Sequence, residues 1–255
     1  MAAPDTPRLV AVTGGSRGIG REIVRCLAKD GFDVAFTYRT SREQAETLLG
    51  ALRADWPERR FQAYRVDLGN RAEVDTFAEV LSDSDSLYGL VHNAGRAYDA
   101  LIALIDQDEA EHVMQVNFWS MTRLVGAAVR PMIRNRAGRI VGIGSLAALH
   151  ATPGNAVYAA SKGAMMSYVR AVAVELGRKG VTANFIAPGY VDTDMVAAYS
   201  DFRDRLEERI PAGRFARSGE VAAFVAHLMS PAAEYINGSV LPIDGGMNAG
   251  IASRA

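Results

Sequence analysis

The stretch LVAVTGGSRGIG, residues 9–20, sets the fold of the chain. The apolar run Leu9–Val12 predicts a buried strand, and glycines follow at once, as in a tight turn. Beyond the turn, apolar residues recur at helical spacing from Ile19 to Leu27, and Gly31 marks the end of the helix. A strand, a glycine turn and a helix in this order predict the first half of a βαβ unit.

The same alternation of short apolar runs and helix-like segments continues along the chain. Seven runs are interpreted as strands, at residues 9–15, 33–39, 61–67, 89–95, 139–145, 182–189 and 238–246. Parallel strands need helical crossovers between them. We therefore predict an α/β fold, a single domain over residues 1–255 with a doubly wound parallel sheet of about seven strands and helices on both faces. The long connection at residues 192–218 suggests a lid.

Bulk composition excludes several classes of function. The formal net charge of −1 gives no general attraction to nucleic acids or membrane surfaces. The single cysteine, Cys26, cannot form an internal disulfide, and the four histidines lack the spacing of a metal site. The N-terminal residues do not resemble a secretory signal, and no apolar run approaches the length of a membrane span. We expect a cytoplasmic protein without a bound metal.

The glycine turn is suited to phosphate binding. Gly14, Gly18 and Gly20 stand between the first strand and the first helix, where a phosphate can approach backbone N–H groups. The spacing is not the common G-x-G-x-x-G fingerprint of dinucleotide sites. It also nearly matches a P-loop, but Arg21 and Glu22 follow where lysine and a hydroxyl residue would be needed. A tight structural turn remains the alternative to a pyrophosphate site.

Cations, and no carboxylate, follow the second predicted strand. Arg39 and Arg42 stand at its end, and Arg17 lies within the glycine turn. Enzymes that use NAD commonly place an acidic residue at this strand end to hold the ribose hydroxyls. Positive charge without an acid favours the 2′-phosphate of NADP, and hence NADPH as cofactor. The alternative is that these arginines are ordinary solvated side chains.

Several motifs, taken in order, resemble those of the short-chain dehydrogenase/reductase family. They are the glycine turn, NAG at 93–95, the serine that ends IGS at 143–145, YAASK at 158–162 and APGYVDTDM at 187–195. The resemblance implies a Rossmann-type fold and an oxidoreductase, a ketoreductase of lipid metabolism. The segments at 210–230 and 235–246 are most similar to those of 3-oxoacyl-[acyl-carrier-protein] reductases of fatty acid biosynthesis.

The resemblance implies a catalytic tetrad of Asn117, Ser145, Tyr158 and Lys162. Tyr158 and Lys162 lie one helical turn apart, so a nearby ammonium is expected to lower the pKa of the phenol. Tyr158 would protonate the substrate carbonyl oxygen while Ser145 hydrogen-bonds it, and Lys162 would also hold the nicotinamide ribose. Asn117 would anchor a water that links Lys162 to solvent.

Cofactor contacts are also implied by position. They are Gly14, Ser16, Arg17, Gly18, Ile19 and Gly20 at the pyrophosphate, Arg39 at the ribose, Asp67 and Leu68 at the adenine, Asn93, Ala94 and Gly95 beneath the chain, Tyr158 and Lys162 in the tetrad, and Pro188, Gly189, Val191 and Thr193 at the nicotinamide end. Asp67 has an alternative role as the cap of the next helix. His92 stands where many relatives have a second asparagine, and it is expected to be a packed or surface histidine.

The resemblance also implies a carrier-linked substrate. Arg136 and Lys179 match basic residues that dock an acyl carrier protein in the resembled reductases, although solvated surface residues are an equal alternative. Both lie toward the amino ends of strands, so a docked carrier could serve only a neighbouring subunit, and the docking hypothesis requires an oligomer. The resemblance alone implies that this oligomer is a homotetramer. The predicted reaction is NADPH-dependent reduction of a 3-oxoacyl thioester. The alternatives are a dehydrogenase of a free alcohol, sugar or steroid, and a non-catalytic NADP-binding regulatory or scaffold protein.

Overall fold

The computed structural model describes residues 7–193 and 202–250, which form a three-layer α/β fold. A central sheet contains β1 (Leu9–Val12), β2 (Asp33–Tyr38), β3 (Phe61–Arg65), β4 (Leu87–His92), β5 (Gly138–Ile143), β6 (Val181–Pro188) and β7 (Val240–Ile243). The strand order is β3-β2-β1-β4-β5-β6-β7, and all neighbours are parallel. The predicted doubly wound sheet of seven strands is confirmed.

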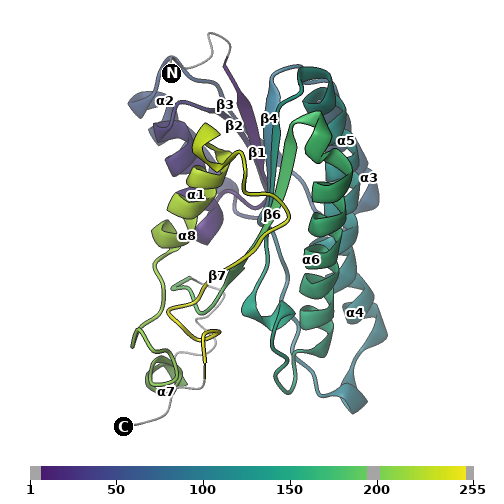
Figure 1. Cartoon of the computed structure of the whole chain (residues 1–255), viewed down its shortest axis with the longest axis vertical. Helices are drawn as coiled ribbons and strands as arrows, with labels where there is room; N and C mark the ends of the chain where they lie inside the picture. Colours follow the sequence, from purple (N-terminus) through teal and green to yellow (C-terminus); the bar gives the residue numbers. More distant parts are fainter. Residues whose placement is uncertain (1–6, 194–201, 251–255) are drawn as a thin grey trace.

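Helices cover both faces of the sheet (Figure 1). One core packs the sheet against α1 (Gly18–Lys29), α2 (Arg42–Asp55) and α8 (Ser218–Met229). The other packs it against α3 (Arg71–Ser82), α5 (Ser120–Asn135) and α6 (Ala156–Leu176), with α4 (Gln107–Met114) and the short α7 (Arg203–Glu207) near the carboxyl edge. Strands β2, β4, β5 and β6 are buried on both faces, as expected for a parallel sheet between two helical layers.

The strand order reverses direction at β1 and β4, which places the ends of these two strands beside a crevice. The residues that follow β1 and β4 are the glycine turn and Asn93–Gly95. Both strands end three residues earlier than the sequence pattern predicted, because the turn residues there adopt loop conformations. Glycine supplies the positive φ at Gly14 (66°) and Gly18 (54°).

Candidate active site

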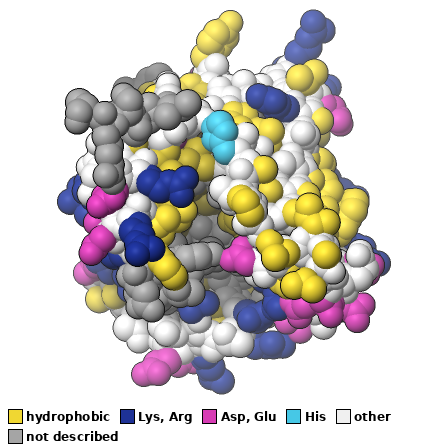
Figure 2. Space-filling view, turned by 90° about the horizontal axis from the view of Figure 1, so that it is seen from below, with side chains coloured by type: hydrophobic (Ala, Val, Ile, Leu, Met, Phe, Trp, Pro, Cys, Tyr) yellow, Lys and Arg dark blue, Asp and Glu magenta, His cyan; other side chains and the backbone are white. Residues whose placement is uncertain are grey.

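A cleft of about 460 Å³ opens at the carboxyl edge of the sheet. Figure 2 looks onto this edge and shows a hollow with Lys and Arg side chains on one part of its rim and hydrophobic side chains on another. Every residue predicted to contact a dinucleotide lines the cleft, and so do Ser145, Tyr158 and Lys162. Asn117 is buried behind it. The roles of these residues in binding and catalysis stay predictions.

The glycine turn brings the start of α1 against β1 and β4. A Cβ atom on Gly20 would lie 2.0 Å from the carbonyl oxygen of Gly14 and 2.6 Å from Nδ2 of Asn93. Asn93 Nδ2 braces the turn by donating to the carbonyls of Thr13 (3.1 Å) and Gly14 (3.0 Å). The N-cap residue of α1 makes no side-chain cap, and the first turn has no acidic residue. The main-chain amides of the first turn of α1 can therefore bind an anion.

The end of β2 supplies the far end of the cleft. Arg39 is exposed there, and the neighbouring Thr37, Thr40 and Ser41 also line the cleft, although sequence reasoning did not select them. Thr37 fixes the turn, because its hydroxyl accepts from the Gly14 amide at 3.1 Å. The hydroxyls that follow Arg39 were a usable sequence signal, because a run of polar residues directly after a buried strand marks the ligand edge. No acidic residue occurs between positions 37 and 41, so the pattern fits a phosphate.

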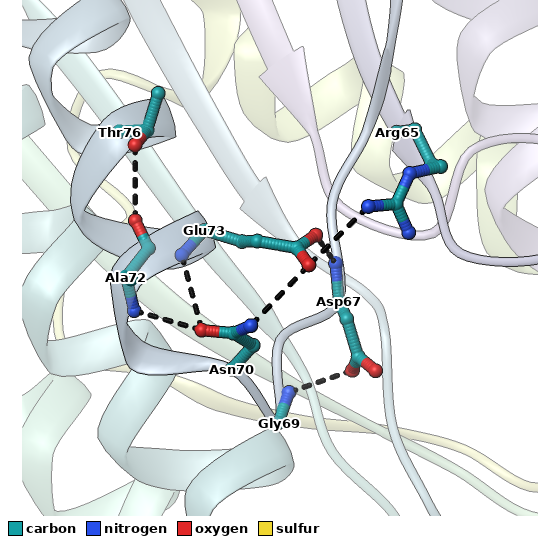
Figure 3. A network of polar contacts seen from close by, with 7 residues as sticks. All are labelled: Arg65, Asp67, Gly69, Asn70, Ala72, Glu73 and Thr76. Carbon is teal, nitrogen blue, oxygen red and sulfur yellow. Dashed lines mark hydrogen bonds and ion pairs between the residues drawn. The ribbon is translucent and has the colours of Figure 1, made fainter.

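Asp67 follows β3 in a polar network drawn in Figure 3. Its Oδ1 accepts from the amide of Gly69 at 2.9 Å, and its own amide donates to Oε2 of Glu73 at 2.9 Å. The next helix, α3, is capped by Asn70, whose side chain accepts from Ala72 and Glu73. The alternative role of Asp67 as the helix cap is therefore wrong. Its carboxylate holds the turn at the edge of the cleft, where the adenine was predicted.

Tyr158 lies in the first turn of α6 and hydrogen-bonds Ser145. Ser145 adopts an extended conformation after β5, and its Oγ accepts from the amide of Ala147 at 3.1 Å. Burial raises the pKa of Tyr158, the Ser145 hydrogen bond lowers it, and the charge of Asp99 raises it, with burial the largest effect. The pKa of Tyr158 is thus raised in the protein alone and not lowered as expected, because desolvation of the phenolate dominates and Lys162 is not among the groups that shift it.

Lys162 is buried one helical turn after Tyr158. Its Nζ donates to the carbonyl of Ile143 at 3.0 Å and lies 5.8 Å from the centre of the Tyr158 ring. Burial lowers the pKa of Lys162 from 10.5 to about 8. A Cβ atom on Gly95 would lie 3.2 Å from Nζ, so the glycine leaves room for the ammonium. The cation thus lines the cleft close to Tyr158, as the predicted tetrad requires.

Asn117 lies in a π-helical segment, Gln115–Trp119, between α4 and α5. Its Oδ1 accepts from the amide of Arg96 at 2.7 Å, and its Nδ2 donates to the Arg96 carbonyl (3.0 Å) and to Ser161 Oγ (2.9 Å). Its side chain is thus engaged by the loop after β4 and by α6. The water predicted at Asn117 stays a prediction. Sequence reasoning missed Arg96, because bonds to main-chain groups leave no mark on residue type. It also missed Ser161, whose hydroxyl is brought to Asn117 only by the fold.

Two predicted features lie away from this cleft or are only partly described. Arg136 ends α5 and Lys179 precedes β6, and both therefore lie at the amino edge of the sheet, opposite the cleft. Of the predicted lid, residues 194–201 lie outside the described residues. Its described remainder contains α7, and within it Arg203 pairs with Asp192 at 3.1 Å. The amide of Ala212 donates to the carbonyl of Gly245 at 3.0 Å, which joins this remainder to the segment after β7.

Residues 7–193 and 202–250 contain no group of three or more His, Cys, Asp or Glu side chains that could hold a metal ion. Nor does any helix in them combine the length and the apolar character that crossing a membrane requires.

The chain is similar in sequence to reductases named for acyl carrier protein substrates. Residues 14–248 match the family model described as enoyl-(acyl carrier protein) reductase. The 3-oxoacyl-[acyl-carrier-protein] reductase MabA of Mycobacterium bovis is 38% identical over 249 residues, which cover 97% of this chain and 95% of the relative. The similarity therefore extends over almost the whole of both proteins.

Solved structures agree with the sequence relatives. A short-chain dehydrogenase/reductase from Serratia marcescens has a TM-score of 0.89 at 36% identity, covering 96% of this chain and 99% of that one. A variant of the actinorhodin polyketide ketoreductase, solved with NADPH, has a TM-score of 0.87 at 29% identity, with the same coverage. One of these solved structures is thus named only for its family, and the other is named as a polyketide ketoreductase.

Proposed function

The chain belongs to the short-chain dehydrogenase/reductase family of oxidoreductases, and from that membership we propose that it reduces a 3-oxoacyl thioester to the 3-hydroxyacyl product with NADPH. The observation that carries the proposal is the placement of the Tyr158–Ser145 pair beside Lys162 at one end of the cleft, with Arg39 at the other. The sequence relative MabA, which is named for this reaction, supports the choice of substrate.

The residues present fit NADPH. The main-chain amides at the start of α1 suit the pyrophosphate. Arg39 suits the 2′-phosphate, because residues 37–41 at the end of β2 include no carboxylate. When bound, NADPH supplies the hydride that reduces the carbonyl carbon. Gly95 keeps the cleft floor open above Lys162, whose ammonium can donate to ribose hydroxyls there.

The chain's own groups manage the proton. Ser145 Oγ donates to the substrate carbonyl oxygen and polarises it, and the hydroxyl of Tyr158 passes its proton to the same oxygen. A phenol whose pKa is raised by burial holds this proton at neutral pH, as a general acid requires. The Lys162 ammonium stabilises the phenolate that remains, and it does so more strongly in a cleft from which water is excluded.

The substrate proposal is tested by comparing substrates with the whole purified chain. NADPH oxidation is followed with an acetoacetyl group on acyl carrier protein, the same group on coenzyme A, and a panel of keto sugars and steroids. We expect the highest kcat/KM with an acyl thioester. A higher kcat/KM with a sugar or steroid ketone would assign another substrate class, and tight NADPH binding without turnover on any carbonyl would favour a regulatory protein.

A further inference from the structure

His92 is the last residue of β4, and its side chain is fully buried. Side chains two apart on a strand share a face, so His92 points to the same side as Leu90. Leu90 packs in the core formed with α5 and α6. The proposed mechanism assigns no role to this histidine. Burying an imidazole nitrogen without a hydrogen-bond partner destabilises the folded state, so the presence of His92 here calls for an explanation.

Thr13 determines which nitrogen of His92 carries the proton. The Thr13 hydroxyl oxygen accepts from the amides of Asn93 (3.0 Å) and Ala94 (3.0 Å), which uses both of its lone pairs. Its single proton is left to donate to Nδ1 of His92, 3.3 Å away. A nitrogen that accepts cannot carry a proton in the neutral ring, so the ring proton of His92 must be on Nε2.

Nε2 of His92 is buried and makes no hydrogen bond of normal geometry to any described residue. The main-chain carbonyls of Asn117 and Val116 nevertheless act on the ring, in the direction that favours its protonated form. Both carbonyls belong to the π-helical segment that carries Asn117. Burial, and then the charge of Lys162, the charged group that faces the ring, lower the pKa of His92 to about 3, so the ring is neutral.

We propose that His92 is a positioning residue that directs its Nε2 proton at the main-chain carbonyls of the π-helical segment and so holds Asn117 in place. The chain of contacts begins at the Asn93 and Ala94 amides beneath the predicted cofactor. It continues through Thr13 and His92 to Asn117, and from Asn117 to Ser161 on the helix of Tyr158. These contacts would hold three parts in place relative to one another: the Asn93–Ala94 main chain, Asn117, and the helix that carries Tyr158.

The tautomer is tested directly by nuclear magnetic resonance on the whole protein labelled with ¹⁵N-histidine, which has only four histidines to resolve. We expect one histidine with its proton on Nε2 and no titration between about pH 5 and pH 8. A buried histidine protonated on Nδ1, or one that titrates in this range, would overturn the proposal. This measurement needs no turnover, so its failure is distinct from a failure of the proposed reductase activity.

The effect of His92 on turnover, through the position of Asn117, rests on the proposed function and is tested with two substitutions. His92→Asn keeps an acceptor for Thr13 and a donor on the other side, whereas His92→Leu fills the space with neither. We expect kcat to fall by about tenfold or more in His92→Leu with NADPH affinity within about threefold of wild type, and His92→Asn to restore most of kcat.

Val91→Ala, on the opposite face of the same strand, is the matched control for lost stability. Its kcat should equal that of the wild type at a temperature where all variants are folded. Wild-type kcat in His92→Leu, or an equal loss of kcat in Val91→Ala, would reduce His92 to a packing residue. If His92→Leu does not fold, the tautomer measurement on the wild type still decides the proposal.

Discussion

At the scale of single residues, the site depends on the burial of two ionisable groups, Tyr158 and Lys162. Burial lowers the pKa of Lys162 to about 8 and raises that of Tyr158. Both pKa values thus depart from those of the free side chains, and burial in the same part of the cleft is the main cause of both shifts. Sequence reasoning found the two residues from their motif but not the direction of the Tyr158 shift, because burial is a property of the assembled fold.

The buried charge of Lys162 predicts a characteristic dependence of stability on pH. The lysine loses its proton near pH 8 when folded and near 10.5 when unfolded. Between these values the unfolded chain binds more protons, so raising the pH favours the folded state. Relative to Lys162→Met, the wild type should gain about 2 kcal/mol of unfolding free energy from about pH 7 to pH 9.5. Urea unfolding of both proteins at fixed concentration measures this, and a constant difference would contradict it.

Arg39 is predicted to decide between the two nicotinamide cofactors. Arg39→Asp removes the cation at the end of β2 and places a carboxylate where ribose hydroxyls bind in NAD enzymes. We expect kcat/KM to fall more than tenfold for NADPH and to rise for NADH. Arg42→Asp, in the exposed first turn of α2 and outside the cleft lining, is the control. An unchanged ratio of NADPH to NADH in Arg39→Asp would remove it from the cofactor site.

At the scale of elements, the strand–turn–helix unit at 9–20 was predictable and the π-helical segment was not. A glycine turn between an apolar run and an amphipathic helix is a local pattern, and the structure has β1 and α1 at those positions. The π-helical segment Gln115–Trp119 adds residues to a turn without changing the apolar face enough to be detected. Its position is set by contacts from Arg96 and Ser161, which come from other elements.

Gly20 is predicted to be required for the closeness of the turn and the helix. A Cβ atom there would meet backbone at 2.0 Å, so Gly20→Ala must move α1 away from the turn. We expect NADPH affinity to fall more than tenfold and the free energy of unfolding to decrease. Gly50→Ala, in α2 with no atom within 4 Å of the added methyl, should gain about 0.5–1 kcal/mol. Equal effects of the two changes in NADPH titration and urea unfolding would contradict this account.

At the scale of the whole molecule, the cleft and the proposed carrier site lie on opposite edges of the sheet. Sequence order alone placed Arg136 and Lys179 before their strands, and the topology puts β5 and β6 side by side. Main-chain contact between Gly138 and Gly180, at 3.1 Å, brings the two segments together. A carrier bound at this edge could not serve the cleft of the same chain. An oligomer would place the carrier near the cleft of a neighbouring chain, but association between chains depends on whole surfaces and leaves no local sequence pattern.

The carrier proposal predicts a selective effect of removing the two cations. Arg136 has a positive φ of 49°, so Arg136→Asn suits its backbone, and Lys179→Gln keeps an exposed polar side chain. In the double variant, kcat/KM should fall several-fold for the carrier-linked substrate and stay unchanged for the coenzyme A thioester. Steady-state kinetics at low salt measures both. Equal losses with both substrates, or none with either, would assign these residues to the solvated surface.

The central claim, that the cleft is a reductase site in which Tyr158 gives the proton, is tested most directly by Tyr158→Phe. NADPH binding by fluorescence and NADPH oxidation with a 3-oxoacyl thioester are measured on the same preparations. Tyr168→Phe, on the same helix and outside the cleft, is the control. We predict that Tyr158→Phe binds NADPH with near wild-type affinity and loses at least about a hundredfold in kcat, while Tyr168→Phe retains activity. Turnover by Tyr158→Phe at the wild-type rate would contradict the account.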